Sequence, residues 1–206
     1  MHASMRRRLV VGAAITAAAA GAIAPAFAAA RTSPSATFFH GGAGKANWSQ
    51  DASNDGDRFS VDLSVPDDSS YAGISLQHVS AAAPATAPSF DFMSTITGAS
   101  GGSPRLHINF TDGGSIELRP LDWTADTWST MDGNDAHSWD NNGGSCGYLY
   151  GTSYSTALAC HLGASVTSAY VVSDSGWLYP QGFHNYIDNI QYDGSTLSAP
   201  SDNGNK

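Results

Sequence analysis

The sequence carries little charge, and little of that charge is basic. Only 13% of its 206 residues are charged, whereas about a quarter is usual for soluble domains, so long helices rich in glutamate and lysine are excluded. Eighteen acidic residues stand against nine basic ones, which gives a formal net charge of -9 at pH 7. Nucleic acids and anionic membranes are bound by clustered lysine and arginine, and no such cluster follows residue 31. We therefore expect neither as a partner.

Glutamate is almost absent. Glu117 is the only one, and the other 17 acidic residues are aspartates. Glycosidases commonly use two carboxylates that flank the bond they cleave, so that chemistry would need aspartate here, and no motif marks a suitable pair. The Gly-x-Ser-x-Gly motif of α/β-hydrolases and the His-Glu-x-x-His motif of zinc proteases are also missing. The sequence leaves catalysis open and favours a protein that is not an enzyme.

The N-terminus has the pattern of a processing signal. Three arginines at residues 6–8 precede an apolar stretch over residues 9–23, and Ala-Phe-Ala ending at Ala28 follows Pro25. A basic start, a short apolar stretch and small residues at a cleavage site define a secretory signal peptide. The apolar stretch is also shorter than the roughly 20 residues that a transmembrane helix needs. We expect residues 1–29 to direct secretion, by the general or the twin-arginine route.

Only two cysteines are present, Cys146 and Cys160. In a secreted protein a single disulfide between them is the plain expectation, and closing a loop of this length stabilises a fold by about 3 kcal/mol. A metal site or a reactive thiol would need a further cysteine or histidine pair at short spacing, which the sequence lacks.

Between the signal peptide and a polar tail at residues 198–206, short runs of β-branched and aromatic residues alternate with clusters of Gly, Pro, Asp and Asn. Residues 58–65 show the strictest alternation, with Val61 and Leu63 on one face. Further strands are predicted at residues 71–76, 89–96, 105–110, 116–121, 166–173 and 186–192. Asp112 and the two glycines after it predict a hairpin turn. Residues 30–197 are thus predicted to form an all-β, antiparallel, two-sheet sandwich.

One segment predicts a helix instead. Residues 153–162 contain helix formers, with Thr152 or Ser153 suited to the N-cap and Gly163 suited to the C-terminal left-handed position. The disulfide would then tie this short helix to the glycine-rich loop at residues 143–147.

The end of the domain resembles a known family. Residues 166–177, followed by YIDNIQY at 186–192, resemble the closing strands of secreted jelly-roll carbohydrate-binding modules and the related laminarinase-like sandwiches. The resemblance implies a jelly-roll topology and a structural calcium ion held in part by Asp188. Such a likeness informs fold more than function.

A second calcium candidate lies in an acidic loop. Asp51, Asp55 and Asp57 occupy positions 1, 5 and 7 of an EF-hand-type loop, where oxygen ligands suit a hard cation. The flanking segments do not predict helices, and position 12 is Asp62 instead of glutamate. An acidic turn without an ion is the alternative.

Several aromatic residues lie in polar loops. Exposed rings pack against the apolar face of a sugar while nearby polar groups bond its hydroxyls. The candidates for such contacts are Trp123, Trp128, Trp139 and Tyr179. We expect Trp139 to be exposed because acidic and amide residues surround it, although a sandwich of this size also needs several buried aromatics.

A polysaccharide lyase is the enzyme class closest to the sequence. Glu117-Leu-Arg119 resembles part of the Arg-x-Glu-Leu-Arg strand of jelly-roll alginate lyases, and His107 lies on the preceding predicted strand. Ser115 stands where the first arginine belongs, and an acidic protein repels a polyuronate.

The sequence as a whole favours a secreted, monomeric, non-catalytic carbohydrate-binding module that binds polysaccharide. The alternatives are a small lyase or glycosidase, and a structural or protein-interaction module of the cell envelope.

Overall fold

The computed structural model describes residues 36–52, 54, 59–99, 103–175 and 182–197. Contacts divide the chain into two units, residues 1–31 and 32–206, and every described residue belongs to the second. The predicted signal peptide and the polar tail lie outside the described residues. Among the described helices, none has the length and apolar character needed to cross a bilayer.

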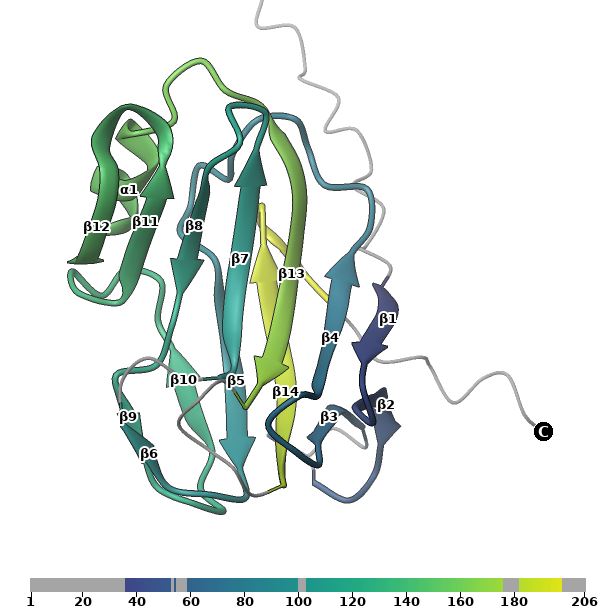
Figure 1. Cartoon of the computed structure of the whole chain (residues 1–206). Helices are drawn as coiled ribbons and strands as arrows, with labels where there is room; N and C mark the ends of the chain where they lie inside the picture. Colours follow the sequence, from purple (N-terminus) through teal and green to yellow (C-terminus); the bar gives the residue numbers. More distant parts are fainter. Residues whose placement is uncertain (1–35, 53, 55–58, 100–102, 176–181, 198–206) are drawn as a thin grey trace, which may run out of the picture. The chain divides into compact units, whose positions relative to one another are not determined.

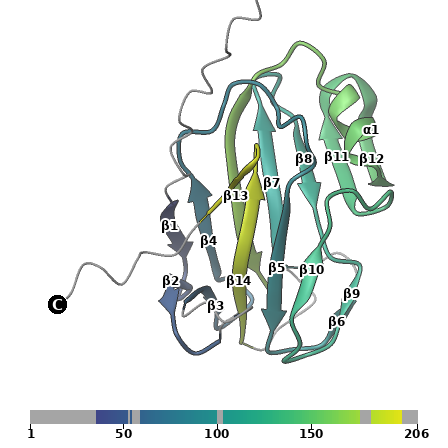
Figure 2. The same cartoon turned by 180° about the vertical axis from the view of Figure 1, so that it is seen from behind.

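Two antiparallel sheets form a β-sandwich (Figures 1 and 2). The seven-stranded sheet has the order β1 (Ala36–Gly41), β4 (Tyr71–Leu76), β13 (Val166–Asp174), β7 (Arg105–Phe110), β8 (Ser115–Leu118), β11 (Trp139–Gly143) and β12 (Gly147–Thr152). The six-stranded sheet comprises β10 (Ser129–Met131), β5 (Ser89–Ser94), β14 (Phe183–Tyr192), β3 (Ser60–Val65) and β2 (Lys45–Ser49), with β15 (Ser195–Thr196) paired to β14. A separate pair joins β6 (Gly98–Ala99) to β9 (Asp122–Trp123). The predicted all-β, two-sheet architecture is confirmed.

Period-two alternation places the core between the two sheets. Val61 and Leu63 of β3 are buried, as predicted, and belong to the same hydrophobic cluster as Leu106 and Ile108 of β7. Because successive side chains of a strand point to opposite faces, the residues between these core positions project from the outer faces of the sheets. The alternation along each strand therefore determines which polar side chains lie together on the outer face of a sheet.

The hairpin between β7 and β8 forms at the predicted turn. Gly113 has a φ of 83°, a left-handed conformation that glycine adopts without strain, and its N–H donates to the carbonyl of Phe110 at 3.1 Å. The turn sets the register in which His107 lies opposite Glu117. Two strands that are adjacent in the sequence thereby bring their polar residues together on one face.

Among the described residues there is one α-helix, α1 (Tyr154–Ala159), and it begins where the sequence predicts. The Ser153 hydroxyl accepts a hydrogen bond from the N–H of Thr156, so Ser153 is the N-cap. The helix ends three residues before the predicted end, because Cys160 and His161 donate to carbonyls only three residues back, which tightens the last turn. The predicted Cys146–Cys160 disulfide is present and joins this end of the helix to η1 (Gly144–Cys146).

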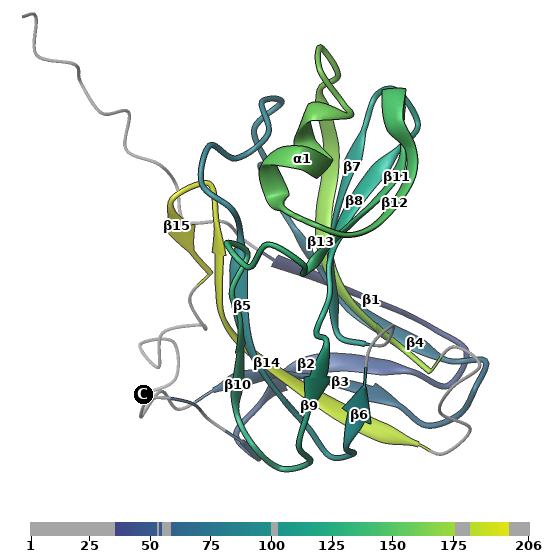
Figure 3. The same ribbon diagram turned by 90° about the vertical axis from the view of Figure 1, so that its left-hand side faces the viewer.

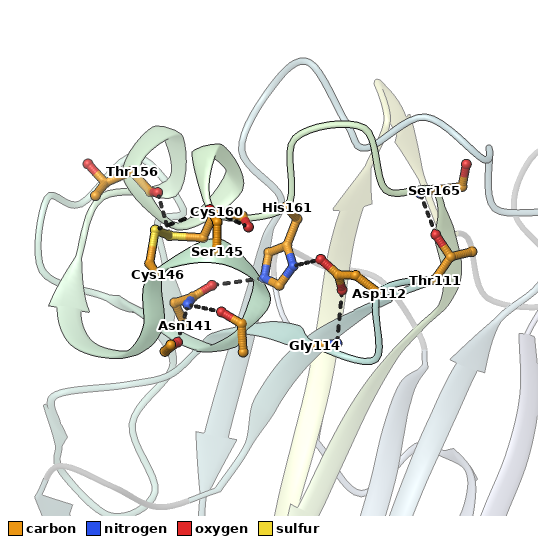
Figure 4. Close-up of polar contacts among 12 residues, drawn as sticks. Thr111, Asp112, Gly114, Asn141, Ser145, Cys146, Thr156, Cys160, His161 and Ser165 are labelled. Atoms are coloured by element: carbon orange, nitrogen blue, oxygen red, sulfur yellow. Dashed lines mark hydrogen bonds and ion pairs between the residues drawn. A yellow bond between two sulfur atoms is a disulfide. The ribbon is translucent and has the colours of Figure 1, made fainter.

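A buried histidine ties the hairpin turn to the β11–β12 ribbon (Figure 4). The His161 side chain has no exposed surface. Its Nδ1 lies 2.8 Å from Asp112 Oδ2 and its Nε2 lies 2.8 Å from Asn141 Oδ1. The Asn141 amide nitrogen donates to the carbonyls of Gly143 and Gly147, which leaves its oxygen as an acceptor.

Each ring nitrogen of His161 therefore lies against a side-chain oxygen, that of Asp112 on one side and that of Asn141 on the other. Hydrogen bonds from the Gly114 N–H and from His161 lower the pKa of Asp112. The resulting pair holds β11 and β12 against the β7–β8 hairpin.

Candidate functional site

Trp139 is not exposed, so the prediction of an exposed sugar-binding ring is wrong. None of its surface is exposed, its Nε1 donates to the Gly133 carbonyl at 2.7 Å, and its ring packs 4.8 Å from that of Tyr154. The surrounding acidic and amide residues belong to a strand, β11, and alternation turns Trp139 inward. Its indole is a core residue.

Of the other predicted aromatic residues, the structure describes Trp123 and Trp128. Trp123 is buried and donates from Nε1 to the Ile96 carbonyl at 2.7 Å, which excludes it as a sugar platform. Trp128 is half-buried and directly precedes β10. Tyr179 lies outside the described residues.

Of the predicted calcium ligands, only Asp188 and Asp51 lie among the described residues. Asp188 of β14 is directly opposite Asp91 of β5, and Asp51 is exposed, while Asp55 and Asp57 lie outside the described residues. Asp91 accepts hydrogen bonds from the side chains of Asn54, Asn189 and Thr130. In the part of the chain that the structure describes, no three His, Cys, Asp or Glu side chains converge as a metal site.

A polar and aromatic surface covers the outer face of the seven-stranded sheet. We call this surface the outer face; its members alternate with the core residues of their strands. It comprises Phe39, Tyr71, Arg105, His107, Glu117, Arg119, Asp140, Tyr148, Tyr150, Tyr170 and Asp174. In Figure 3 the sheet bends so that β1 and β4 at one side and β11 and β12 at the other flank this face.

Cross-strand register aligns the residues at the centre of the outer face. Tyr170 is opposite His107, His107 is opposite Glu117, and Glu117 is opposite Asp140. The row thus crosses four neighbouring strands at right angles to their direction. The rings of Tyr170 and His107 stack with centroids 4.8 Å apart, and Phe39 meets Tyr170 edge-on at 5.7 Å.

Arg105 joins the charged groups at the centre of this row. Its Nη2 forms an ion pair with Asp174, its Nε donates to His107 Nε2 at 3.2 Å, and the same Nε lies 3.9 Å from Glu117 Oε2. The side chains of Arg105, Glu117 and Asp174 are each partly exposed. A ligand on the outer face can therefore contact all three.

His107 is neutral in this environment. Burial, together with the charge of Arg105, lowers the pKa of His107 to about 3. Because Nε2 accepts from Arg105, the ring proton lies on Nδ1, which is 3.4 Å from Glu117 Oε1. The contact is thus a weak hydrogen bond and not an ion pair. Burial also raises the pKa of Glu117, and the charges of Asp140 and Asp174 add to that effect, while Arg105 opposes it.

A second ion pair supports the tyrosines at the edge of the outer face. Arg119 Nε donates to Asp140 Oδ2, and Asp140 Oδ1 accepts from the Gly151 N–H at 2.8 Å, which anchors β12. Tyr148 and Tyr150 project from that strand with ring centroids 4.5 Å apart. Their exposed fractions are 56% and 69%, and a hydrogen bond between them raises the pKa of Tyr148 to about 12, so its phenol stays protonated.

The sequence contained a signal for this surface. Tyr148 and Tyr150 alternate around Leu149, and Arg105 and His107 alternate around Leu106, which is the period-two pattern of a strand with one polar face. His107, Glu117 and Arg119 of the outer face were singled out from the sequence through the lyase-like pattern.

Comparison of the sequence with models of known protein families finds no match, and comparison with curated proteins finds none.

Proposed function

We propose that the protein is a secreted, non-catalytic carbohydrate-binding module of jelly-roll type, and that it binds polysaccharide on the outer face. The observation that carries this proposal is the placement of exposed rings on both sides of the charged groups of the outer face. Tyr71 lies on one side, opposite Asp174, and Tyr148 with Tyr150 lies on the other. Tyrosine rings stack on the apolar faces of sugars, and carboxylates and guanidinium groups bond the hydroxyls.

The span of the outer face favours a chain of sugars as the ligand. Tyr71 is on β4 and the tyrosine pair is on β12, five strands further along the sheet. Neighbouring strands lie about 4.8 Å apart, so the two aromatic ends are too distant for one sugar ring to contact both. The ligand that fits is a segment of polysaccharide lying across the strands.

Removing the two exposed tyrosines is expected to abolish most binding. In the Tyr148→Ala/Tyr150→Ala variant we expect affinity for the preferred polysaccharide to fall at least about tenfold, because each ring that buries apolar surface against a sugar contributes on the order of 1 kcal/mol. Affinity electrophoresis across a panel of soluble polysaccharides measures this loss. The thermal midpoint should change little, since both rings are exposed.

Leu162→Ala is the matched control. This residue is 85% exposed and follows the helix, away from the outer face, so its removal should leave retention unchanged. Equal retention of the tyrosine variant and the wild type on every polysaccharide would refute the proposed site. No retention of the wild type on any of them would favour a structural or protein-interaction module instead.

A polysaccharide lyase is the second candidate, because the structure gathers His107, Glu117 and Arg119 on the same face as Tyr148. A histidine, a tyrosine and an arginine can serve as base, acid and neutraliser of a uronate carboxylate. Incubating the protein with each polysaccharide of the panel and measuring new unsaturated chain ends decides between the two functions. A binding module retains the polysaccharide and leaves its chain length unchanged.

We also propose a structural calcium ion at Asp188. Asp188 and Asp91 are directly opposite on neighbouring strands, and like charges in that position destabilise a sheet. Asn54 and Asn189 donate to the Asp91 carboxylate from their amide nitrogens, and Thr130 donates from its hydroxyl. Carboxylate oxygens are preferred calcium ligands, so the facing carboxylates of Asp188 and Asp91 support the proposal.

Calcium is expected to raise the thermal midpoint of the wild type relative to EDTA, because an ion bound only by the folded state stabilises it. Asp188→Ala should remove that rise and leave the midpoint in EDTA close to the wild-type value. An equal loss of stability in calcium and in EDTA would show that Asp188 acts without an ion.

A further inference from the structure

We infer that the outer face selects neutral polysaccharides and rejects polyuronates and sulfated chains, because both of its arginines are already neutralised by carboxylates of the same face. This inference rests on the proposed function and names the class of ligand that the face takes.

The fixed charges of the outer face leave no positive excess. Its two guanidinium groups, on Arg105 and Arg119, stand against the carboxylates of Glu117, Asp140 and Asp174. His107 adds no charge, since it is neutral at pH 7. With Glu117 ionised the face has a net charge of -1, and protonation of Glu117 would only bring it to zero. An anionic sugar therefore meets no net attraction at this surface.

Neither aspartate can easily release its arginine. The Ser103 hydroxyl bonds the backbone carbonyl and N–H of Asp174, both at 2.5 Å, and also lies 3.4 Å from the carboxylate oxygen Oδ1. Asp140 is buried and accepts from the Gly151 N–H at 2.8 Å. Turning either carboxylate aside would leave a charge without its partner in a partly desolvated site, which is costly. A ligand carboxylate or sulfate cannot take the place of these groups cheaply.

Sugar hydroxyl groups are better hydrogen-bond partners for the arginines and Glu117 of the outer face than ligand carboxylates or sulfates are. A guanidinium group has five N–H donors, and the contacts of Arg105 and Arg119 engage only some of them. Glu117 is partly exposed and offers acceptor oxygens to sugar hydroxyls. A neutral sugar can donate to Glu117 and accept from an arginine at the same time, without breaking either ion pair.

The test compares polysaccharides that differ only in charge. Hydroxyethylcellulose against carboxymethylcellulose, mannan against mannuronan, and dextran against dextran sulfate form suitable pairs for affinity electrophoresis at low ionic strength. For each pair of polysaccharides that the protein retains, we expect the neutral member to bind at least about tenfold more tightly than the charged one, since like charges brought together at an interface are strongly unfavourable. Added salt should reduce this difference in affinity, because it screens exposed charges.

Glu117→Gln tests the electrostatic origin of the selection. It removes one negative charge and keeps the side chain's size, so binding of the charged member should improve by about threefold, the effect of one partly exposed charge. Asp126→Asn is the matched control. Asp126 is exposed and acts on Tyr186 of the six-stranded sheet, so it changes the protein's net charge equally without altering the outer face. The Asp126→Asn variant should favour the neutral polysaccharide over the charged one by the same factor as the wild type.

The outcomes separate the inference from the proposed function. Tighter binding of the charged members, abolished by Tyr148→Ala/Tyr150→Ala, would overturn the inference and keep the site. Equal gains for Glu117→Gln and Asp126→Asn would show that overall charge, not the outer face, sets the preference, and would also overturn it. Failure of every member of every pair to bind would overturn the proposed function, and the inference with it.

Discussion

Replacing Trp139 with alanine is expected to lower the free energy of unfolding by about 4 kcal/mol, within the range for removing a fully buried tryptophan. The side chain has no exposed surface and packs against Tyr154. Its indole N–H also bonds the Gly133 carbonyl, which would be left without this donor. Urea denaturation followed by circular dichroism measures the loss as a shift of the unfolding midpoint.

Two further variants separate the sources of this loss. Trp139→Phe keeps most of the packing and removes the hydrogen bond, so it should cost clearly less than alanine. Leu162→Ala removes a side chain that is almost fully exposed and should cost close to nothing. A small loss for Trp139→Ala, together with weakened polysaccharide binding, would contradict the structure and restore the exposed role that the sequence predicted.

Removing the disulfide is expected to cost about 3 kcal/mol, the loop-closure contribution for cysteines this close in the chain. Cys146 and Cys160 are separated by 14 residues. The bridge fixes the turn between β11 and β12 to the end of α1, where the hydrogen-bonded ring of His161 also lies. The Cys146→Ser/Cys160→Ser variant, compared with the wild type by urea denaturation, measures this contribution.

Reduction of the wild type provides the control for the cysteine variant. Dithiothreitol should bring the wild type close to the stability of the double serine variant and should leave that variant unchanged. Unaltered stability of the wild type on full reduction, verified by thiol titration, would mean that the bridge adds nothing to the fold.

The strands of the core could be predicted from the sequence, because their alternation reflects burial on one face. The bounds of β4 and β7 agree with the prediction at both ends, and β13 and β14 are extensions of predicted strands. The edge strands β1, β12, β2 and β10 and the inner strand β11 were missed. The sequence WDNNG of β11 has few strand-forming residues, and its pairing with β8 and β12 outweighs that local preference. The burial of Trp139 follows from this pairing and could not be predicted from the sequence.

The site could be predicted in part. His107 and Glu117 are equally distant from Asp112, so the predicted hairpin turn already places them side by side. The contribution of β13 was not accessible, because it inserts between β4 and β7, far from both in the chain. Asp174 and Tyr170 therefore join the outer face through tertiary pairing alone.

The most direct test of the central claim is a titration of the ¹⁵N-labelled protein with the soluble polysaccharide that it retains best, followed by amide chemical shifts. If polysaccharide binds on the outer face, the largest changes should fall on β7, β8 and β12, at residues such as His107, Glu117 and Tyr148. Changes confined to the six-stranded sheet, around Tyr186 and Trp128, would contradict the assignment of the binding site to the outer face.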